Sequence, residues 1–236
     1  MTEALPGREV VIVDDVAGAA AERIAAAVRA GGHIALSGGS TPRKAHERLA
    51  GMGLDWSGVT LWFGDDRAVG PEHEHSNYRM AKESLLDHVS AGEVHRIKGE
   101  LGYEAAADDY ERELRGSFGD GVPSLDLVLL GLGPDSHTAS LFPGDDALGE
   151  RERVAVGVKT PGMAPLVSRV TLTLPVLNAG KEVVFLISGE DKAEAVARAF
   201  GDAPDPGAPA SLVRPEPGNL TLLLDPPAAA RLGATG

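Results

Sequence analysis

The chain has 236 residues, of which 43% are hydrophobic and 24% charged, as in one globular domain spanning residues 1–236. It contains no cysteine, which excludes disulfides, thiolate metal sites and cysteine nucleophiles. A formal net charge of -13 argues against nucleic-acid binding, and no apolar run approaches the roughly 18 residues of a membrane span, so neither partner is expected.

Apolar runs and amphipathic stretches alternate along the chain. In order, we expect a strand at 9–15, a helix at 16–32, a strand at 33–39, a helix at 41–53, a strand at 59–66, helices at 76–89 and 102–118, strands at 125–133, 152–159, 169–175 and 181–189, a helix at 190–200, a loop at 201–219 and a strand at 220–225. Apolar strands separated by helices are typical of a parallel sheet covered on both faces. Ligands of such sheets bind beyond the carboxyl ends of the strands.

The first strand-end loop, "LSGGSTPRK", combines a glycine turn with the start of a helix. Thr41 is expected as the N-cap and Pro42 as the first helical residue. Gly38 and Gly39 let backbone N–H groups face outward and form an anion-binding nest, to which Arg43 adds charge. The alternative is a capped helix start that binds nothing.

The second candidate segment lies at the end of the strand at 59–66 and carries Asp65 and Arg67. An arginine beside carboxylates is either a satisfied ion pair or an oriented electrostatic stabiliser. Farther along, His73 and His75 raise the alternative of a metal site. We expect no metal there, because the loop is polar throughout and exposed histidines are more often solvated.

The third loop lies in "LLGLGPDSHTASLFPG", which holds Asp135 and His137 close together after an apolar strand. No G-x-S-x-G motif is present, so a serine nucleophile elbow is excluded. A histidine at a strand end titrates near neutral pH in its unperturbed form, which makes His137 a candidate general base. The alternative is a loop histidine that is bonded to the backbone.

The fourth pair of candidates lies in the last third of the chain. Arg169 begins a predicted strand, and Lys192 lies in the first turn of a predicted helix. A cation in that turn opposes the helix dipole, which favours an anion nearby. A solvated surface lysine is the alternative.

The chain closely resembles the 6-phosphogluconolactonase family in four motifs and in their order. The motifs are "LSGGSTPR", "FGDDRAV" with "SNY", "GLGPDSHTASLFPG" and "RVTLTLPVLN". The resemblance runs from about Val10 nearly to the end of the chain. It implies a Rossmann-like three-layer α/β sandwich with a mostly parallel sheet, of the NagB/RpiA type, and no cofactor. It also implies hydrolysis of the sugar-phosphate lactone 6-phosphoglucono-δ-lactone to 6-phosphogluconate in the pentose phosphate pathway.

The same resemblance implies roles for individual residues. His137 occupies the position of the general base, and Asp65 and Arg67 match the acidic and arginine positions of the family's D-E-R motif. Arg169 and Lys192 resemble phosphate-binding cations. The expected catalytic residues are therefore His137, Asp65, Arg67 and Asp135, and the expected substrate-binding residues are Gly38, Gly39, Ser40, Thr41, Arg43, Asn77, Arg169 and Lys192.

Several positions depart from the family pattern. Asp66 stands where glutamate is usual, and His46 and His75 stand where tyrosine and an acidic residue are common. Ser136 replaces a glycine between Asp135 and His137, so its backbone is expected to avoid a strongly positive φ.

Two alternative functions stay open. A glucosamine-6-phosphate deaminase or sugar-phosphate isomerase would carry a glutamate in the histidine loop, where this chain has Leu141 and Phe142. A non-catalytic sugar-phosphate binder would keep the glycine loop but could lose the acid–base residues. No signal peptide is visible at the N-terminus, so a cytoplasmic location is expected, and the chain is expected to be a monomer.

Overall fold

The computed structural model describes residues 2–5, 8–201 and 203–233. Its main sheet has eight strands, namely β1 (Thr2–Leu5), β2 (Arg8–Ile12), β3 (Gly32–Leu36), β4 (Val59–Phe63), β6 (Glu93–Val94), β7 (Leu127–Leu130), β10 (Glu182–Ile187) and β11 (Asn219–Leu224). The spatial order is β1-β2-β11-β10-β7-β3-β4-β6. All neighbours pair in parallel except β1 and β2, which are antiparallel. The predicted mostly parallel sheet is confirmed.

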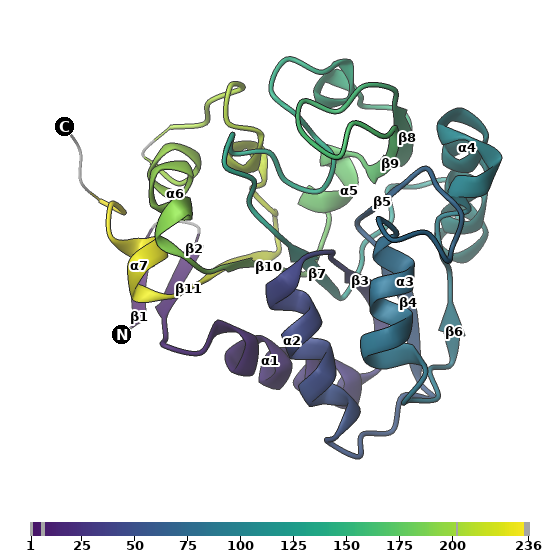
Figure 1. Ribbon diagram of the computed structural model, residues 1–236, viewed down its shortest axis with the longest axis horizontal. Coiled ribbons are helices and arrows are strands. Elements are labelled where there is room, and N and C mark those ends of the chain that lie inside the picture. The colour runs from purple at the N-terminus through teal and green to yellow at the C-terminus, as the bar shows by residue number, and fades with distance from the viewer. Residues whose placement is uncertain (1, 6–7, 202, 234–236) are drawn as a thin grey trace.

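Helices cover both faces of this sheet. They are α1 (Val16–Ala30), α2 (Ser40–Ala50), α3 (Asn77–Ala81), α4 (Tyr103–Phe118), α5 (Leu174–Asn178), α6 (Ala193–Ala199) and α7 (Pro226–Ala229). Short turns of other helix types lie at Lys82–Leu86 (η1, a π-helix), Gly99–Leu101 (η2), Asp146–Gly149 (η3), Glu190–Lys192 (η4) and Pro209–Leu212 (η5). Figure 1 shows α1 and α2 on one side of the sheet and α4, α5 and α6 on the other, which confirms the three-layer sandwich. None of the helices in the described part of the chain could span a membrane.

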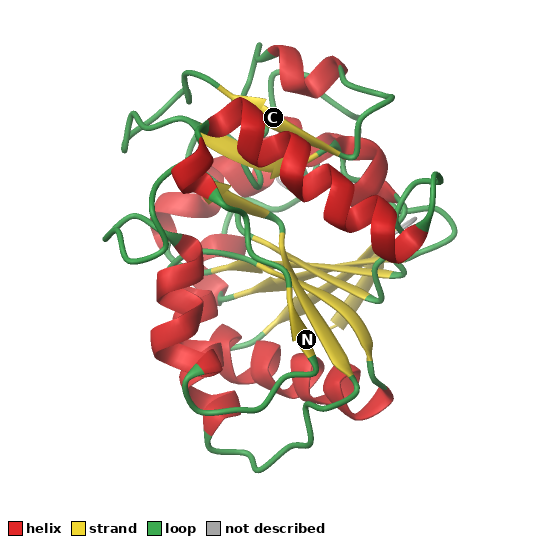
Figure 2. Ribbon diagram, turned by 90° about the vertical axis from the view of Figure 1, so that its right-hand side faces the viewer, coloured by secondary structure: helices red, strands yellow, loops and turns green. Residues whose placement is uncertain are grey.

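A second sheet was not foreseen. β5 (Asp65–Arg67), β9 (Arg169–Leu172) and β8 (Ala155–Val158) form a three-stranded antiparallel sheet in that order. Figure 2 shows it as a separate group of strands above the twisted main sheet. Strands near 152–159 and 169–175 were predicted correctly, but their apolar pattern carried no information about which strands they pair with. In this ladder Arg67 lies opposite Arg169 and Asp65 lies opposite Thr171, so the pairing of β5 with β9 brings both arginines and Asp65 into one small sheet.

The core explains why β7 lies in the middle of the main sheet. Every residue of β7 is buried, and the strand is flanked by β3 and β10. Tyr110 of α4, which is fully buried, donates a hydrogen bond to the carbonyl of Phe63 at 2.9 Å and accepts one from its N–H at 2.8 Å. These two hydrogen bonds fix the end of β4 immediately before Asp65 and Asp66.

The strand order has a switch point between β3 and β7. From β3 the chain continues to β4 and β6 on one side, whereas from β7 it continues to β10 and β11 on the other. Neighbouring loops therefore leave the sheet in opposite directions at this point, which opens a crevice beyond the carboxyl ends of the strands.

His46 of α2 gives the fold a pH dependence. Its side chain is fully buried, with Nδ1 3.2 Å from Ser84 Oγ and no partner for Nε2 among the described residues. Burial lowers the pKa of His46 from 6.5 to about 4. As the pH falls from 6.5 to 4, the unfolded chain binds a proton that the folded chain does not, so the folded state loses stability.

We expect the free energy of unfolding to fall by up to about 3 kcal/mol over this pH window through His46 alone. Replacing His46→Gln should make the pH dependence shallower between pH 6.5 and 4, measured by urea unfolding. The exposed histidine in His88→Gln serves as the matched control and should leave the slope unchanged. Parallel curves for the wild type and His46→Gln would contradict the assignment.

Candidate active site

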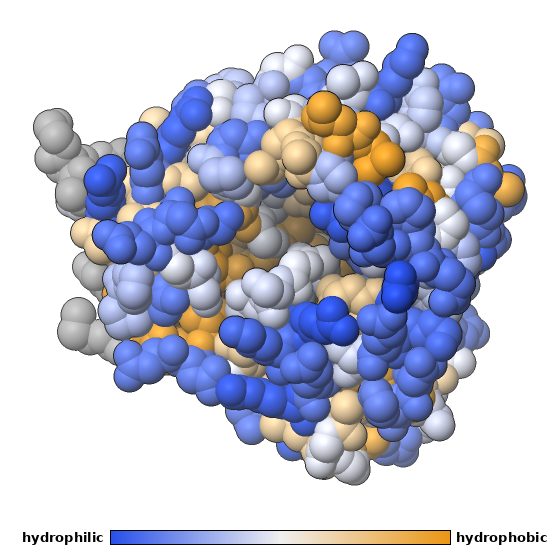
Figure 3. All heavy atoms as spheres, viewed as in Figure 1, coloured by the Kyte–Doolittle hydropathy of each residue, from blue (hydrophilic) through white to orange (hydrophobic). Residues whose placement is uncertain are grey.

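A cleft of about 300 Å³ lies at the switch point. It is lined by loops that follow β3, β4, β7 and β10 and by the loop between β8 and β9. Figure 3 shows a hollow in the middle of this face, rimmed mostly by hydrophilic residues. Eight of the site residues predicted from the sequence line this cleft, namely Gly38, Gly39, Asp65, Arg67, Asn77, His137, Arg169 and Lys192.

His137 and Asp135 form a hydrogen-bonded pair at the cleft. Asp135 Oδ1 lies 2.5 Å from His137 Nδ1 and also accepts from the His137 backbone N–H at 3.1 Å. Burial raises the pKa of Asp135, but the hydrogen bonds and charge of His137 outweigh it and hold that pKa below its usual range. An ionised Asp135 fixes the proton on Nδ1, so Nε2, which has no partner among the described residues, is free to accept a proton from a ligand.

Gly133 makes this pair possible, and sequence reasoning missed its role. A Cβ atom at residue 133 would lie 2.0 Å from His137 Nδ1 and 2.8 Å from Asp135 Oδ1. The imidazole therefore lies directly against the backbone of Gly133, where only a glycine fits. The spacing G-P-D-S-H was the available signal, because the second glycine precedes the histidine by four residues.

The expectation for Ser136 was wrong. Its φ is 65°, in the left-handed region, although the residue is not glycine. Its N–H donates to the Gly133 carbonyl at 3.0 Å, its carbonyl accepts from Ala210 at 3.0 Å, and its hydroxyl donates to the Ala195 carbonyl at 3.3 Å. These tertiary contacts impose the turn that a glycine would adopt freely.

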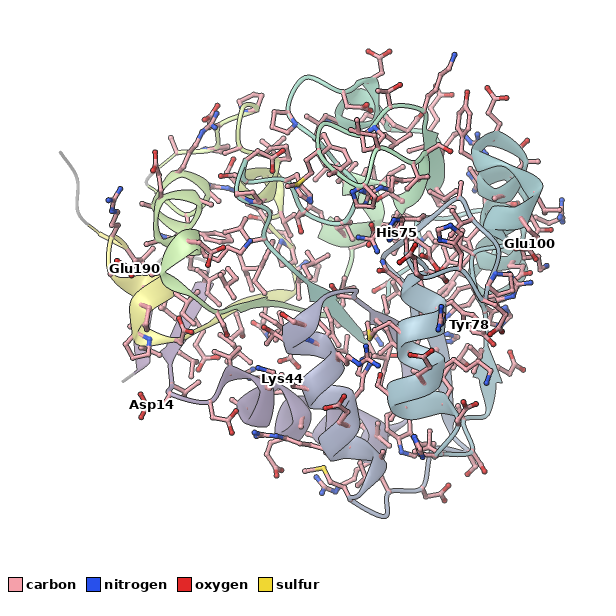
Figure 4. The ribbon with its side chains drawn as sticks, viewed as in Figure 1. Asp14, Lys44, His75, Tyr78, Glu100 and Glu190 are labelled. Atoms are coloured by element: carbon pink, nitrogen blue, oxygen red, sulfur yellow. The ribbon has the colours of Figure 1, made fainter. Side chains whose placement is uncertain are left out.

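Asp66 is a structural carboxylate at the start of α3. It accepts hydrogen bonds from the backbone N–H groups of Arg67, Asn77 and Tyr78 at 2.7, 2.6 and 2.9 Å, and from the Ser76 hydroxyl at 3.2 Å. Burial raises the pKa of Asp66 to about 6, against the lowering effect of these backbone donors. Asp66 thus anchors the N-terminus of α3 beside the cleft; Figure 4 labels His75 in the loop before it and Tyr78 on the helix.

Asn77, the first residue of α3, connects the other members of this wall. Its Oδ1 accepts from Arg67 Nη1 at 3.0 Å, and its Nδ2 donates to the Asp65 carbonyl at 3.0 Å. A Cβ atom at Gly38 would lie 2.1 Å from Asn77 Oδ1. Gly38 is therefore required for close packing between the glycine turn and the Asn77 side chain of α3.

The two arginines that line the cleft have no ion-pair partner in the described part of the chain. Arg67 Nη1 donates to Asn77 and to the His75 carbonyl at 2.7 Å. Arg169, only 3% exposed, donates to the carbonyls of Pro165 and Val167 at 3.1 and 3.2 Å. Burial, and then the nearby charge of Arg67, lower the pKa of Arg169. Both cations thus keep their charge available to a ligand.

Phe142 places Arg169 and His137 near each other. Its buried ring lies with its centroid 4.5 Å from that of His137, and the guanidinium carbon of Arg169 lies 5.8 Å from the Phe142 centroid. The base candidate and a buried cation therefore flank the same aromatic side chain.

The N-cap of α2 lies two residues earlier in the chain than the sequence predicted. Helix α2 begins at Ser40, and its N-cap is Gly39 with a φ of 115°, so Thr41 is not the N-cap and Pro42 is not the first helical residue. Gly39 adopts a φ that favours glycine, and the first N–H groups of α2, which begins immediately after it, lack intrahelical acceptors as at every helix start.

Some nominated residues lie beside the cleft and do not line it. Ser40 is exposed, Thr41 is partly buried, and neither belongs to the cleft wall. Arg43 is exposed and pairs with Glu47 at 3.5 Å and Glu83 at 3.3 Å on the outer face of α2.

Lys192 contributes the third cation from the turn before α6. It lines the cleft, and its Nζ lies 3.7 Å from Asp191 Oδ2.

His73 and His75 have ring centroids 5.2 Å apart, but no group of three metal-ligating side chains occurs among the residues that the structure describes.

The site thus combines a histidine hydrogen-bonded to a carboxylate with three cations and a glycine-rich helix start. Such a cleft, at the switch point of a parallel sheet, is that expected of an α/β enzyme acting on a small anionic substrate. The chain belongs to the glucosamine-6-phosphate isomerase/6-phosphogluconolactonase family, whose model matches residues 8–222. The resemblance inferred from the four motifs is confirmed.

Its relatives include several 6-phosphogluconolactonases. One from Nostoc is 39% identical over 207 residues, which cover 84% of this chain and 84% of that protein. The human protein is 44% identical over 176 residues, covering 73% of this chain and 67% of the human one. The crystal structure of 6-phosphogluconolactonase from Leishmania guyanensis superposes with a TM-score of 0.83 at 34% identity, over 96% of this chain and 98% of that one.

Replacing Gly133→Ala should displace the His137 imidazole, because the new methyl group would overlap it. We expect loss of the His137–Asp135 hydrogen bond, visible in a crystal structure or in the imidazole nitrogen shifts, and destabilisation of about 1–3 kcal/mol. Gly131→Ala is the control, since its nearest neighbour would be Ser37 Oγ at 3.9 Å. An unmoved imidazole in Gly133→Ala would refute the steric argument.

Proposed function

We propose that this protein hydrolyses 6-phospho-D-glucono-1,5-lactone to 6-phospho-D-gluconate, the lactonase step of the oxidative pentose phosphate pathway. The observation that carries the proposal is that His137, hydrogen-bonded to Asp135, lines the same cleft as Arg67 and Arg169, which have no ion-pair partner in the described chain, in a chain of this family. No cofactor is required for this hydrolysis. The protein is proposed to act as a cytoplasmic monomer.

His137 is the proposed general base. Asp135 holds the proton on Nδ1, so Nε2 takes a proton from water as its oxygen attacks the lactone carbonyl carbon. Proximity of the buried Phe142 ring limits the orientations of the imidazole. The oxygen–carbon bond forms and the carbonyl electrons move onto oxygen, which gives a tetrahedral oxyanion.

The oxyanion collapses by breaking the bond between the carbonyl carbon and the ring oxygen. Protonated His137 donates its Nε2 proton to the departing ring oxygen, which becomes a hydroxyl group. Arg67 is the proposed electrostatic stabiliser of the oxyanion, because its guanidinium lines the cleft without a carboxylate partner in the described chain. Asp65 is proposed to orient the sugar from the same wall.

The phosphate anchor is proposed to comprise Arg169, Lys192 and the start of α2. Arg169 and Lys192 supply charge in the cleft, and the turn at Gly38 and Gly39 exposes backbone N–H groups at a helix N-terminus. Concentrated positive charge is needed here, because the chain carries a net charge of -13 that repels an anionic substrate at long range.

The residues that follow His137 in its loop argue against a deaminase on the same fold. Leu141 and Phe142 are both buried at the place where a deaminase would carry a ring-opening glutamate. Phe142 packs against the His137 ring, and neither side chain supplies a proton donor.

Replacing His137→Ala should lower kcat for the phosphorylated lactone by roughly 100-fold or more, the usual share of acid–base catalysis. The assay is acid release from freshly prepared lactone, corrected for spontaneous hydrolysis. Binding of 6-phosphogluconate should change little, which separates catalysis from folding. Retention of wild-type kcat in a folded variant would remove His137 from the mechanism.

Replacing Arg169→Ala should raise KM for the phosphorylated lactone by roughly 10-fold or more, since a charged hydrogen bond contributes about 1.5–3 kcal/mol. KM for unphosphorylated glucono-δ-lactone should change far less. Arg112→Ala, on the exposed face of α4, is the matched control and should alter neither constant. Equal effects of Arg169→Ala on the two substrates would rule out a phosphate contact.

A further inference from the structure

Asp65 is a carboxylate that does not pair with the cations around it. It lines the cleft together with Arg67 and Arg169, and it pairs across the ladder of β5 with β9. Its negative charge acts on Arg169, so the two groups lie within electrostatic range. Nevertheless, no ion pair joins Asp65 to either guanidinium in the part of the chain that the structure describes.

Ser140 accounts for the orientation of Asp65. The Ser140 hydroxyl donates to Asp65 Oδ2 at 2.6 Å, and both side chains are buried. The other oxygen, Oδ1, has only a long contact of 3.4 Å from Asn77 Nδ2. The strongest hydrogen bond to this carboxylate therefore comes from a neutral hydroxyl group 75 positions farther along the chain.

Ser140 is itself held in place through its backbone. Its backbone N–H donates to Thr171 Oγ1 at 3.2 Å, and the Thr171 hydroxyl donates to the Leu172 carbonyl at 3.0 Å. Ser140 and Thr171 are both completely buried. The backbone of Ser140 is thus attached to the small sheet that also carries Asp65 and Arg169, which fixes the position from which its hydroxyl group reaches Asp65.

We propose that Ser140 is a positioning residue that holds Asp65 away from Arg67 and Arg169, so that both guanidinium groups remain available to the anionic substrate. A buried carboxylate without a donor forms a charge-assisted bond with a cation in reach, since such bonds are about twice as strong as neutral ones. That bond would neutralise a cation of the cleft. The Ser140 hydroxyl satisfies Asp65 without adding or cancelling charge.

This inference rests on the proposed function only in the identity of the anion. The free oxygen of Asp65 then accepts a sugar hydroxyl, while the guanidinium groups take the charged groups of the ligand. The role of Ser140 is visible in anion affinity, which can be measured without turnover.

The decisive variant is Ser140→Ala. We expect the Kd of 6-phosphogluconate and the KM of the lactone to rise by roughly 10-fold, with a smaller change in kcat, because one cation is diverted to Asp65. Calorimetry with 6-phosphogluconate and with inorganic phosphate gives the affinities. Ser211→Ala is the matched control, since Ser211 is equally buried and hydrogen-bonded to Asp205 outside the cleft; it should lose stability but keep the affinity.

A double-mutant cycle isolates the mechanism. In the Asp65→Asn background no carboxylate can pair with the guanidinium groups, so adding Ser140→Ala should cause no further loss of affinity. Fully additive losses would overturn the inference, as would wild-type affinity in Ser140→Ala. If Ser140→Ala does not fold, Ser140→Cys, which keeps the size but donates weakly, should show the same direction of change, and an unchanged Kd there would overturn it.

Failure of the proposed function gives a different pattern. A wild-type protein that binds inorganic phosphate but releases no acid from the lactone would sink the lactonase assignment. The affinity difference between wild type and Ser140→Ala would still decide the role of Ser140.

Discussion

The cleft depends on burying guanidinium groups without giving them a carboxylate partner. Removing a cation from water costs several kcal/mol, and proteins usually offset that cost with an ion pair. Arg67 and Arg169 instead donate to carbonyl and amide oxygens, which leaves their net charge intact, and Arg67 Nε has no hydrogen-bond partner in the described part of the chain. In a protein with a net charge of -13, this local excess of positive charge is what can attract an anionic ligand.

Neighbouring carboxylates are arranged so that they do not cancel this charge. Asp66 is turned toward the backbone of α3, and Asp65 is engaged by Ser140. Asp135 is engaged by His137. Each carboxylate therefore has a defined donor that is not the guanidinium group of a cleft arginine. Acidic residues in the loop after β4 would otherwise favour a closed, neutral cluster in place of an open binding site.

The His137–Asp135 pair is also held by close packing. The imidazole of His137 lies against the backbone of Gly133 on one side and against the ring of Phe142 on the other. Ser136 keeps the intervening turn in the left-handed region through contacts with Ala195 and Ala210. An imidazole held this closely loses little orientational freedom when a ligand binds.

The sequence by itself determined the layers of the fold, because apolar strands alternating with helices leave few other ways to bury both faces of a sheet. It also determined that Gly38, Asp65, His137 and Lys192 follow strands whose ends meet at one edge. Only the tertiary structure decided how these residues are held: the small sheet that joins Asp65 to Arg169, the contact of Gly133 with His137, and the bond from Ser140 to Asp65. Those features arise between segments far apart in the chain or from the shape of a turn, and local pattern carries no information about which distant donor a buried charge will meet.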